Sequence, residues 1–228
     1  MLRFPFDDLG QPPDEQEPFP AYPRRVIEIV EKAICMAWQQ LVAEGRLDLR
    51  VAREDTITKA LQVHLVDIMN KKKVKGYDAR VFGQPGRGSA VPDYTETRLN
   101  KQPDLTFTFL SARPLAINRG LFYECKSVGP PGEYLGPNGI GRFTEGDYAS
   151  AMPHAGMLAY VQRKKEPLTA QVAIEAAVKN GALTVLSHFA DTKVTYHPVH
   201  VSVHSRYFTL PNGKSPGEIS IRHIWLTP

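Results

Sequence analysis

The sequence has few cysteines and no long apolar run. Of its 228 residues only Cys35 and Cys125 are cysteines, and neither belongs to a spacing typical of metal ligands. Two isolated thiols argue against a disulfide framework and favour a reducing compartment. Charged residues interrupt every apolar stretch well before the ~20 residues that a membrane helix needs, and the first six residues are too short for a signal peptide. These absences predict a cytoplasmic protein with no membrane partner.

Neither sign of charge dominates. The net charge of +4 is compatible with a polyanionic partner but does not identify one. Hydrophobic residues make up 42% of the chain and charged residues 23%, a balance that is ordinary for a globular protein. The length suits one domain with a short appendage. The prolines and acidic residues of 1–23 predict an irregular or mobile N-terminal arm, and 24–228 is the predicted domain.

Periodicity predicts the elements of this domain. Apolar residues recur at helical spacing over 24–44 and 55–72, whereas aromatic and β-branched residues indicate strands over 79–82, 104–110 and 121–128. The later predicted elements are a glycine- and proline-rich loop over 129–141, a short helix over 144–151, a strand over 156–161, a helix over 169–180 and strands over 183–186, 199–203 and 219–225. This order predicts an α/β fold in which helices flank a mixed β-sheet.

Two of the predicted strands carry an unusual set of charges. Side chains alternate between the two faces of a strand, so Glu124 and Lys126 share one face while Cys125 points to the other. If the two strands fold back on each other about Pro114, Asp104 falls directly opposite Glu124. Cross-strand partners have Cβ atoms about 4.5–5.5 Å apart, close enough for two carboxylates to share one ion.

Such a grouping costs free energy in a strand with a purely structural role, because carboxylates that face each other repel. Mg²⁺ compensates this repulsion directly, since it prefers carboxylate, water and phosphate oxygens, and it lowers the pKa of a coordinated water. Lys126 would then orient the attacking water or stabilise developing charge, and the sequence leaves both roles open. The alternative is an ion-paired strand face that binds no metal.

The Pro103-Asp104 pair, nineteen intervening residues and then Glu124-Cys125-Lys126 resemble the motif of the PD-(D/E)xK nuclease superfamily. The resemblance covers residues 54 to 161 and implies a restriction-endonuclease-like αβββαβ core. It also implies a Mg²⁺-dependent endonuclease that hydrolyses DNA phosphodiester bonds, with Mn²⁺ able to substitute. Asp104, Glu124 and Lys126 would be its catalytic core.

The same resemblance implies further site residues. A glutamate on the preceding helix often completes such a site, and Glu54 occupies that place, with Asp55 as the alternative inward acid. The backbone carbonyl of Cys125 is a further implied ligand, so the implied metal ligands are Asp104, Glu124, Cys125 and Glu54. Arg142 and Tyr148 lie in the stretch where the family places a helix after its third strand, and they are the implied substrate-binding residues.

For partners, the resemblance implies DNA, a homodimer or a place in a multi-protein system, and a role in defence against foreign DNA. Two alternatives remain: a catalytically silent nucleic-acid-binding or assembly subunit, and a nuclease that acts on RNA. The basic runs at 71–75 and 163–165 would line a phosphate-binding groove or simply be solvated ends of elements.

Weaker matches elsewhere are interpreted as chance. Pro13-Asp14 lies in the arm, Pro92-Asp93 in a polar loop, and Asp191-Thr192-Lys193 in a predicted loop between strands. His200 and His204 are expected on the outward face of a strand, without a cysteine to complete a zinc site.

Overall fold

The computed structural model describes residues 17–88, 94–95, 102–110, 119–128, 131–162, 189–194 and 197–228. Its helices are α1 (Arg24–Glu44), α2 (Glu54–Asn70), α3 (Pro131–Leu135) and α4 (Gly141–Thr144). Its strands are β1 (Leu105–Phe107), β2 (Leu121–Ser127), β3 (His154–Tyr160), β4 (Phe189–Val194), β5 (His197–His204) and β6 (Ile219–Leu226). The predicted helix at 169–180, the strand at 183–186, the basic run at 163–165 and residues 1–16 of the arm lie outside the described residues.

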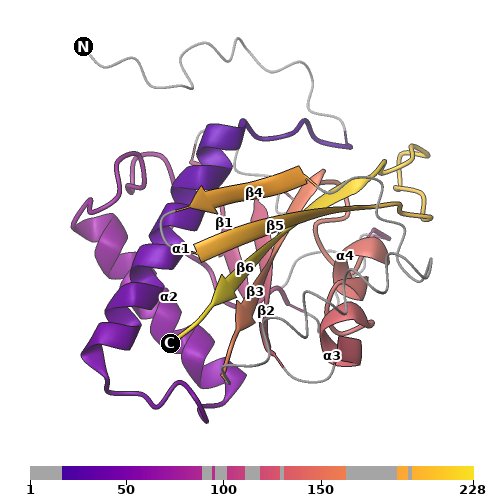
Figure 1. Ribbon diagram of the computed structural model, residues 1–228. Helices are drawn as coiled ribbons and strands as arrows, with labels where there is room; N and C mark the ends of the chain where they lie inside the picture. Colours follow the sequence, from indigo (N-terminus) through magenta and orange to yellow (C-terminus); the bar gives the residue numbers. More distant parts are fainter. Residues whose placement is uncertain are drawn as a thin grey trace.

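A six-stranded mixed sheet in the order β1-β2-β3-β6-β5-β4 forms the centre of the fold. The strands β2, β3 and β6 run parallel to one another, whereas β1 pairs antiparallel with β2 at one edge. At the other edge β5 pairs antiparallel with both β6 and β4. Figure 1 shows α1 and α2 on one side of the sheet and α3 and α4 on the other. The predicted α/β class with a mixed, helix-flanked sheet is confirmed.

The helix α1 packs on the sheet through the apolar stripe that its sequence predicts. Val30, Ile34 and Trp38 are almost completely buried. On the same face the buried carboxylate of Glu31 accepts hydrogen bonds from the guanidinium of Arg222 on β6, with Nη2 to Oε2 at 2.9 Å. The charge of each partner is therefore compensated where α1 covers the sheet. No helix of the described residues is long and apolar enough to cross a membrane.

The helix α1 ends at Gly45, as the sequence predicts. Gly45 has φ 60° and ψ 13°, a left-handed conformation, and its N–H donates to the carbonyl of Val42 at 3.2 Å. We expect Gly45→Ala to lower the free energy of unfolding by about 1 kcal/mol, because a Cβ is strained at this φ although nothing lies within 4 Å of it. Gly132→Ala is the matched control, since that Cβ also meets nothing. Urea denaturation that shows equal stability for both variants would contradict this expectation.

The hairpin register agrees with the predicted one. Leu105 lies opposite Tyr123, and Phe107 lies opposite Leu121. Continued by one residue, this pairing places Asp104 opposite Glu124. The alternation of faces also holds, because the Cys125 thiol contacts Tyr160 and Thr58 while the side chain of Glu124 does not.

The strand predicted at 79–82 is wrong. The Asp78 side chain accepts a hydrogen bond from the Arg80 N–H at 2.8 Å, and its carbonyl accepts from Val81 and Phe82 at 3.0 Å. This local bonding closes a turn, and only an isolated bridge joins Phe82 to Phe109. The aromatic and β-branched composition therefore indicated burial rather than a strand.

The segment before β3 also differs from its prediction. The expected loop at 129–141 contains α3, which places Tyr134 in the core against Trp225 with ring centroids 5.5 Å apart. The expected helix at 144–151 is a series of turns, and the helical residues are instead Gly141–Thr144. A left-handed residue at Gly146, φ 82°, is incompatible with a helix at that point.

Two further expectations near the C-terminus are wrong. Residues 191–193 belong to β4 rather than to a loop. His204 is buried instead of facing outward, because its Nε2 bonds to Ser202 Oγ at 2.6 Å, and that oxygen lies 2.7 Å from His223 Nε2. A buried polar chain thus satisfies groups that the alternating pattern assigned to solvent.

The last part of the predicted arm is ordered against the domain. Phe19 and Tyr22 are buried, and the Phe19 N–H donates to the carbonyl of Ala151 at 2.9 Å. The ring of Tyr22 lies 4.3 Å from that of Phe109. Residues 17–23 therefore belong to the packed domain, because two aromatic side chains fix them to its core.

Candidate active site

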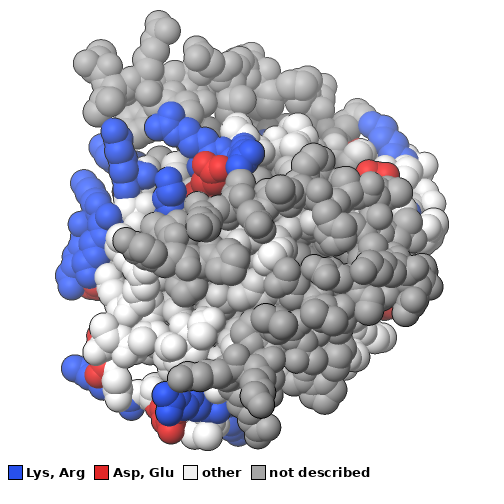
Figure 2. Space-filling model, viewed as in Figure 1, with Lys and Arg blue, Asp and Glu red and all other residues white. Residues whose placement is uncertain are grey.

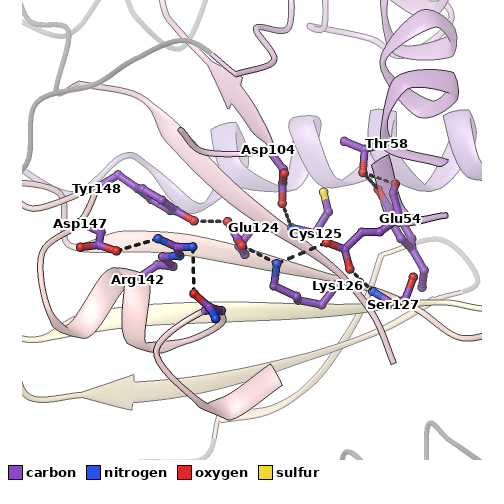
Figure 3. Close-up of polar contacts among 12 residues, drawn as sticks. Glu54, Thr58, Asp104, Glu124, Cys125, Lys126, Ser127, Arg142, Asp147 and Tyr148 are labelled. Carbon is purple, nitrogen blue, oxygen red and sulfur yellow. Dashed lines mark hydrogen bonds and ion pairs between the residues drawn. The ribbon is translucent and has the colours of Figure 1, made fainter. Parts of the chain in front are cut away.

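The two predicted acids, Asp104 and Glu124, meet at the paired ends of β1 and β2. Asp104 Oδ2 accepts a hydrogen bond of 2.7 Å from the backbone N–H of Cys125, which fixes its carboxylate beside β2. The Glu124 side chain is only 5% exposed. Figure 3 shows the two side chains on their adjacent segments, and burial disfavours the charge of both carboxylates.

Lys126 lies between two carboxylates. Its Nζ is 2.7 Å from Glu124 Oε1 and 3.3 Å from Glu54 Oε1. Burial disfavours the charged ammonium, but the negative charges of Glu124, Glu54 and Asp104 outweigh that effect and raise the pKa of Lys126. The side chain therefore stays a cation at neutral pH, and the three residues predicted from the two strands come together.

Glu54 reaches this group from the first turn of α2. Its Oε2 accepts a hydrogen bond of 2.6 Å from the Ser127 N–H, and its Oε1 faces Lys126. The choice between Glu54 and Asp55 is thereby decided, because the Asp55 side chain is 73% exposed. In this structure Glu54 Oε2 contacts the Ser127 N–H and its Oε1 contacts the Lys126 ammonium, and its role as a metal ligand stays a prediction. Its position also holds the Lys126 ammonium by an ion pair.

Burial perturbs both strand carboxylates. The pKa of Glu124 is raised to about 7, first by burial and then by the negative charge of Asp104, against the opposing effects of Lys126 and Tyr148. The pKa of Asp104 is raised mainly by burial, and the hydrogen bond from Cys125 opposes the rise. The protein thus holds two acids where their ionisation is mutually unfavourable, which is typical of sites that bind a cation or transfer protons.

Tyr148 and Arg142 lie on the side of Glu124 that faces away from Glu54 (Figure 3). The Tyr148 hydroxyl is buried and donates a hydrogen bond to Glu124 Oε2. Arg142 Nη1 donates to Asp147 Oδ2 at 3.0 Å, and its Nη2 donates to Asn138 Oδ1 at 3.1 Å. Tyr148 therefore contacts a site carboxylate, and substrate binding by Tyr148 stays a prediction. Substrate binding by Arg142 stays a prediction.

The donor set fits a hard divalent cation in part. Carboxylate oxygens of Asp104 and Glu124, with the predicted backbone carbonyl of Cys125, are the ligand types that Mg²⁺ and Mn²⁺ prefer. The described residues contain no group of three or more His, Cys, Asp or Glu side chains placed to hold one ion. Two carboxylates and a carbonyl leave positions for water and a substrate oxygen, as Mg²⁺ sites usually do.

The sequence pattern missed one cation at the edge of this region. The Arg87 guanidinium forms an ion pair with Asp55, next to Glu54, and its charge acts on Asp104. The local sequence Gly86-Arg87-Gly88 gives a signal only in hindsight, since a basic residue between glycines suits a loop that approaches a phosphate. Its proximity to Asp104 arises from long-range folding.

The basic run at 71–75 lies away from the acids. It follows the C-terminal end of α2, whereas Glu54 begins that helix, so about 25 Å of helix separates the two. Figure 2 shows Lys and Arg gathering along the side of the molecule formed by α1 and α2. Contact of this run with a bound polyanion therefore requires a ligand long enough to extend well beyond the acids.

Comparisons of this chain with protein-family models, with curated proteins and with solved structures gave no match.

Proposed function

We propose that the protein is a metal-dependent nuclease that hydrolyses phosphodiester bonds of DNA. The observation that carries the proposal is the position of Lys126, whose ammonium lies between Glu124 and Glu54 beside Asp104. A purely structural ion pair needs one acid for one base. Here two carboxylates contact one ammonium and the charge of a third, Asp104, also acts on it, so the acids outnumber the one base in contact with them and suit a further cation.

The residues divide into distinct roles in this proposal. Asp104, Glu124 and the Cys125 carbonyl would hold Mg²⁺ or Mn²⁺, and Glu54 would keep Lys126 in place. The bound ion would lower the pKa of a water and neutralise charge on the phosphate. Lys126 would donate hydrogen bonds to the attacking water or to the phosphate oxygens, since its pKa is raised and it keeps its protons. Tyr148 would orient the Glu124 carboxylate through its hydroxyl.

The fold family, the biological role and the assembly of the protein are parts of the same proposal. The restriction-endonuclease-like fold is supported by β1 and β2 pairing antiparallel, by β3 beside β2, and by the site residues on these elements and on α2. A role in defence against foreign DNA, and action as a homodimer or within a multi-protein system, accompany it as further parts of the proposal.

Metal removal tests the proposal. We expect nicking or linearisation of plasmid DNA with Mg²⁺ or Mn²⁺, complete loss of cleavage with EDTA, and recovery when excess Mg²⁺ is added back. Agarose gels of plasmid DNA incubated with the purified protein measure this result. Loss of cleavage in Asp104→Asn, with retained folding by circular dichroism, excludes a contaminating nuclease.

A parallel incubation with single-stranded and duplex RNA separates the alternatives. Cleavage of RNA but not DNA would change the substrate and keep the site. Intact DNA and RNA in every metal, together with salt-sensitive DNA binding, would support the catalytically silent module instead. If the protein neither cleaves nor binds DNA or RNA, nucleic acid is not its substrate or its partner.

A further inference from the structure

Residues 83–88 run along the outer edge of β1. The Gly86 N–H donates to the Thr106 carbonyl at 2.9 Å, and the Thr106 N–H donates to the Gly86 carbonyl at 3.0 Å. Continued by one residue, this antiparallel pairing places Arg87 beside Leu105, the residue that follows Asp104. The chain thus brings a cation to the edge of the candidate site from an element that contributes nothing else to it.

The Arg87 side chain forms one ion pair and keeps an N–H group that has no partner among the described residues. It is 25% exposed and forms an ion pair with Asp55, whose own side chain is 73% exposed. The Nε of Arg87 is buried and has no hydrogen-bond partner among the described residues. The positive charge of Arg87 also opposes the rise in the pKa of Asp104, so the two side chains lie within electrostatic range.

The ion pair with Asp55 does not explain the position of Arg87. Pairs with so exposed a partner contribute little to stability and are screened by salt. A guanidinium with an unused N–H is instead suited to a phosphate, which accepts two parallel hydrogen bonds from its planar fork. Gly88 follows Arg87 with φ 62°, and a Cβ there would lie 2.8 Å from Gln102 Oε1, so the chain turns closely past Gln102 directly after Arg87.

We propose that Arg87 binds a backbone phosphate of the nucleic acid, next to the scissile phosphate at the metal site that Asp104 and Glu124 would form. The inference rests on the proposed nuclease function. In the free protein the Arg87 guanidinium forms an ion pair with Asp55. The incoming phosphate takes the place of the Asp55 carboxylate. The two members of the ion pair therefore act in opposite directions on substrate affinity: Arg87 strengthens binding, and Asp55 competes with the substrate.

Steady-state cleavage of a labelled duplex in Mg²⁺ tests this arrangement. We expect Arg87→Gln to raise KM about 10-fold while kcat changes less than about 3-fold, and the slope of log KM against log salt to fall by about 1. Asp55→Asn should lower KM about 2- to 4-fold. The exchanged variant Asp55→Arg with Arg87→Asp restores an ion pair but should keep the raised KM.

Matched controls come from the exposed pair Arg24–Glu28 on α1, whose Nε–Oε1 distance is 2.8 Å. Arg24→Gln and Glu28→Gln change the net charge as Arg87→Gln and Asp55→Asn do. Both residues lie in the first turns of α1. About 30 Å of helix separates Arg24 from Glu44, the end of α1 that leads into α2, so the control pair is far from the candidate site. A change in KM below about 2-fold in both controls shows that the total charge is not responsible.

Three outcomes overturn the inference. The first is an unchanged KM in Arg87→Gln while the wild-type protein cleaves, which removes the phosphate contact and leaves the nuclease proposal intact. The second is recovery of the wild-type KM in the exchanged variant, which assigns Arg87 a structural role. The third is a wild-type protein that neither binds nor cleaves nucleic acid in any metal, in which case the nuclease proposal fails together with this one.

Discussion

Lys126→Ala is expected to lower kcat for DNA cleavage by about 10³-fold, with a change in KM below about 3-fold. The ammonium is the only described cation in contact with Glu124 and Glu54, so alanine removes the hydrogen-bond donor and leaves no side chain to replace it. Single-turnover cleavage of a labelled duplex measures the chemical step without product release.

Lys59→Ala is the matched control for this variant, because Lys59 lies exposed on α2, five residues after Glu54. Binding of Mn²⁺, followed by electron paramagnetic resonance, should persist in Lys126→Ala, since the proposed ligands are unchanged. A Lys126→Ala protein that cleaves DNA within about 5-fold of wild type would falsify the catalytic role of this lysine. Loss of folding would be visible as a lowered Tm and would be distinguished from loss of chemistry.

The hairpin could be predicted from sequence because its rules are local. A period of two separates Glu124 and Lys126 from Cys125, and symmetry about Pro114 places Asp104 opposite Glu124, as the register of β1 and β2 bears out. The helices α1 and α2 follow from apolar spacing with little error, since both pack one face on the same sheet.

The contacts around the acids could not be predicted in the same way. Tyr148 reaches Glu124 because the turns at 145–151 carry it there, and those turns depend on packing of Gly146 against Phe208 and Tyr94. Arg87 reaches the region through pairing of an irregular segment with β1. Both contacts join positions far apart in the chain, where periodicity carries no information.

The turn at 78–82 illustrates a different kind of failure. Its composition suits a strand, and Phe82 is buried as a strand residue would be. The hydrogen bonds to Asp78 decide the local conformation instead, because an aspartate side chain satisfies backbone N–H groups two residues ahead. Burial was therefore predictable there and backbone conformation was not.

Glu124→Gln is expected to abolish cleavage and, at the same time, to stabilise the metal-free protein above pH 7. Wild-type Glu124 has a folded-state pKa of about 7, well above its ordinary value of 4.5, because burial and Asp104 disfavour its charge. The unfolded state therefore loses this proton first. The contribution of Glu124 to stability is fully present below about pH 4.5 and is lost as pH rises through 7.

Glutamine keeps the shape of the Glu124 side chain and replaces its titrating carboxyl group with a neutral amide. We expect the free energy of unfolding of Glu124→Gln to exceed that of wild type by on the order of 3 kcal/mol at pH 8 and to equal it near pH 4.5. Urea denaturation in EDTA at both pH values measures the difference. Asp67→Asn gives the opposite sign, because hydrogen bonds from Lys71 and Lys73 lower the pKa of Asp67.

The sign of this effect separates the two readings of the charged strand face. If Glu124 were there to pair with Lys126 for stability, glutamine would break a buried ion pair and destabilise the protein at pH 8. If Glu124 is kept for a cation that the fold alone does not supply, the metal-free protein gains stability from its removal. Added Mg²⁺ should then raise the Tm of the wild-type protein and leave that of Glu124→Gln nearly unchanged, since only the wild type retains both carboxylates.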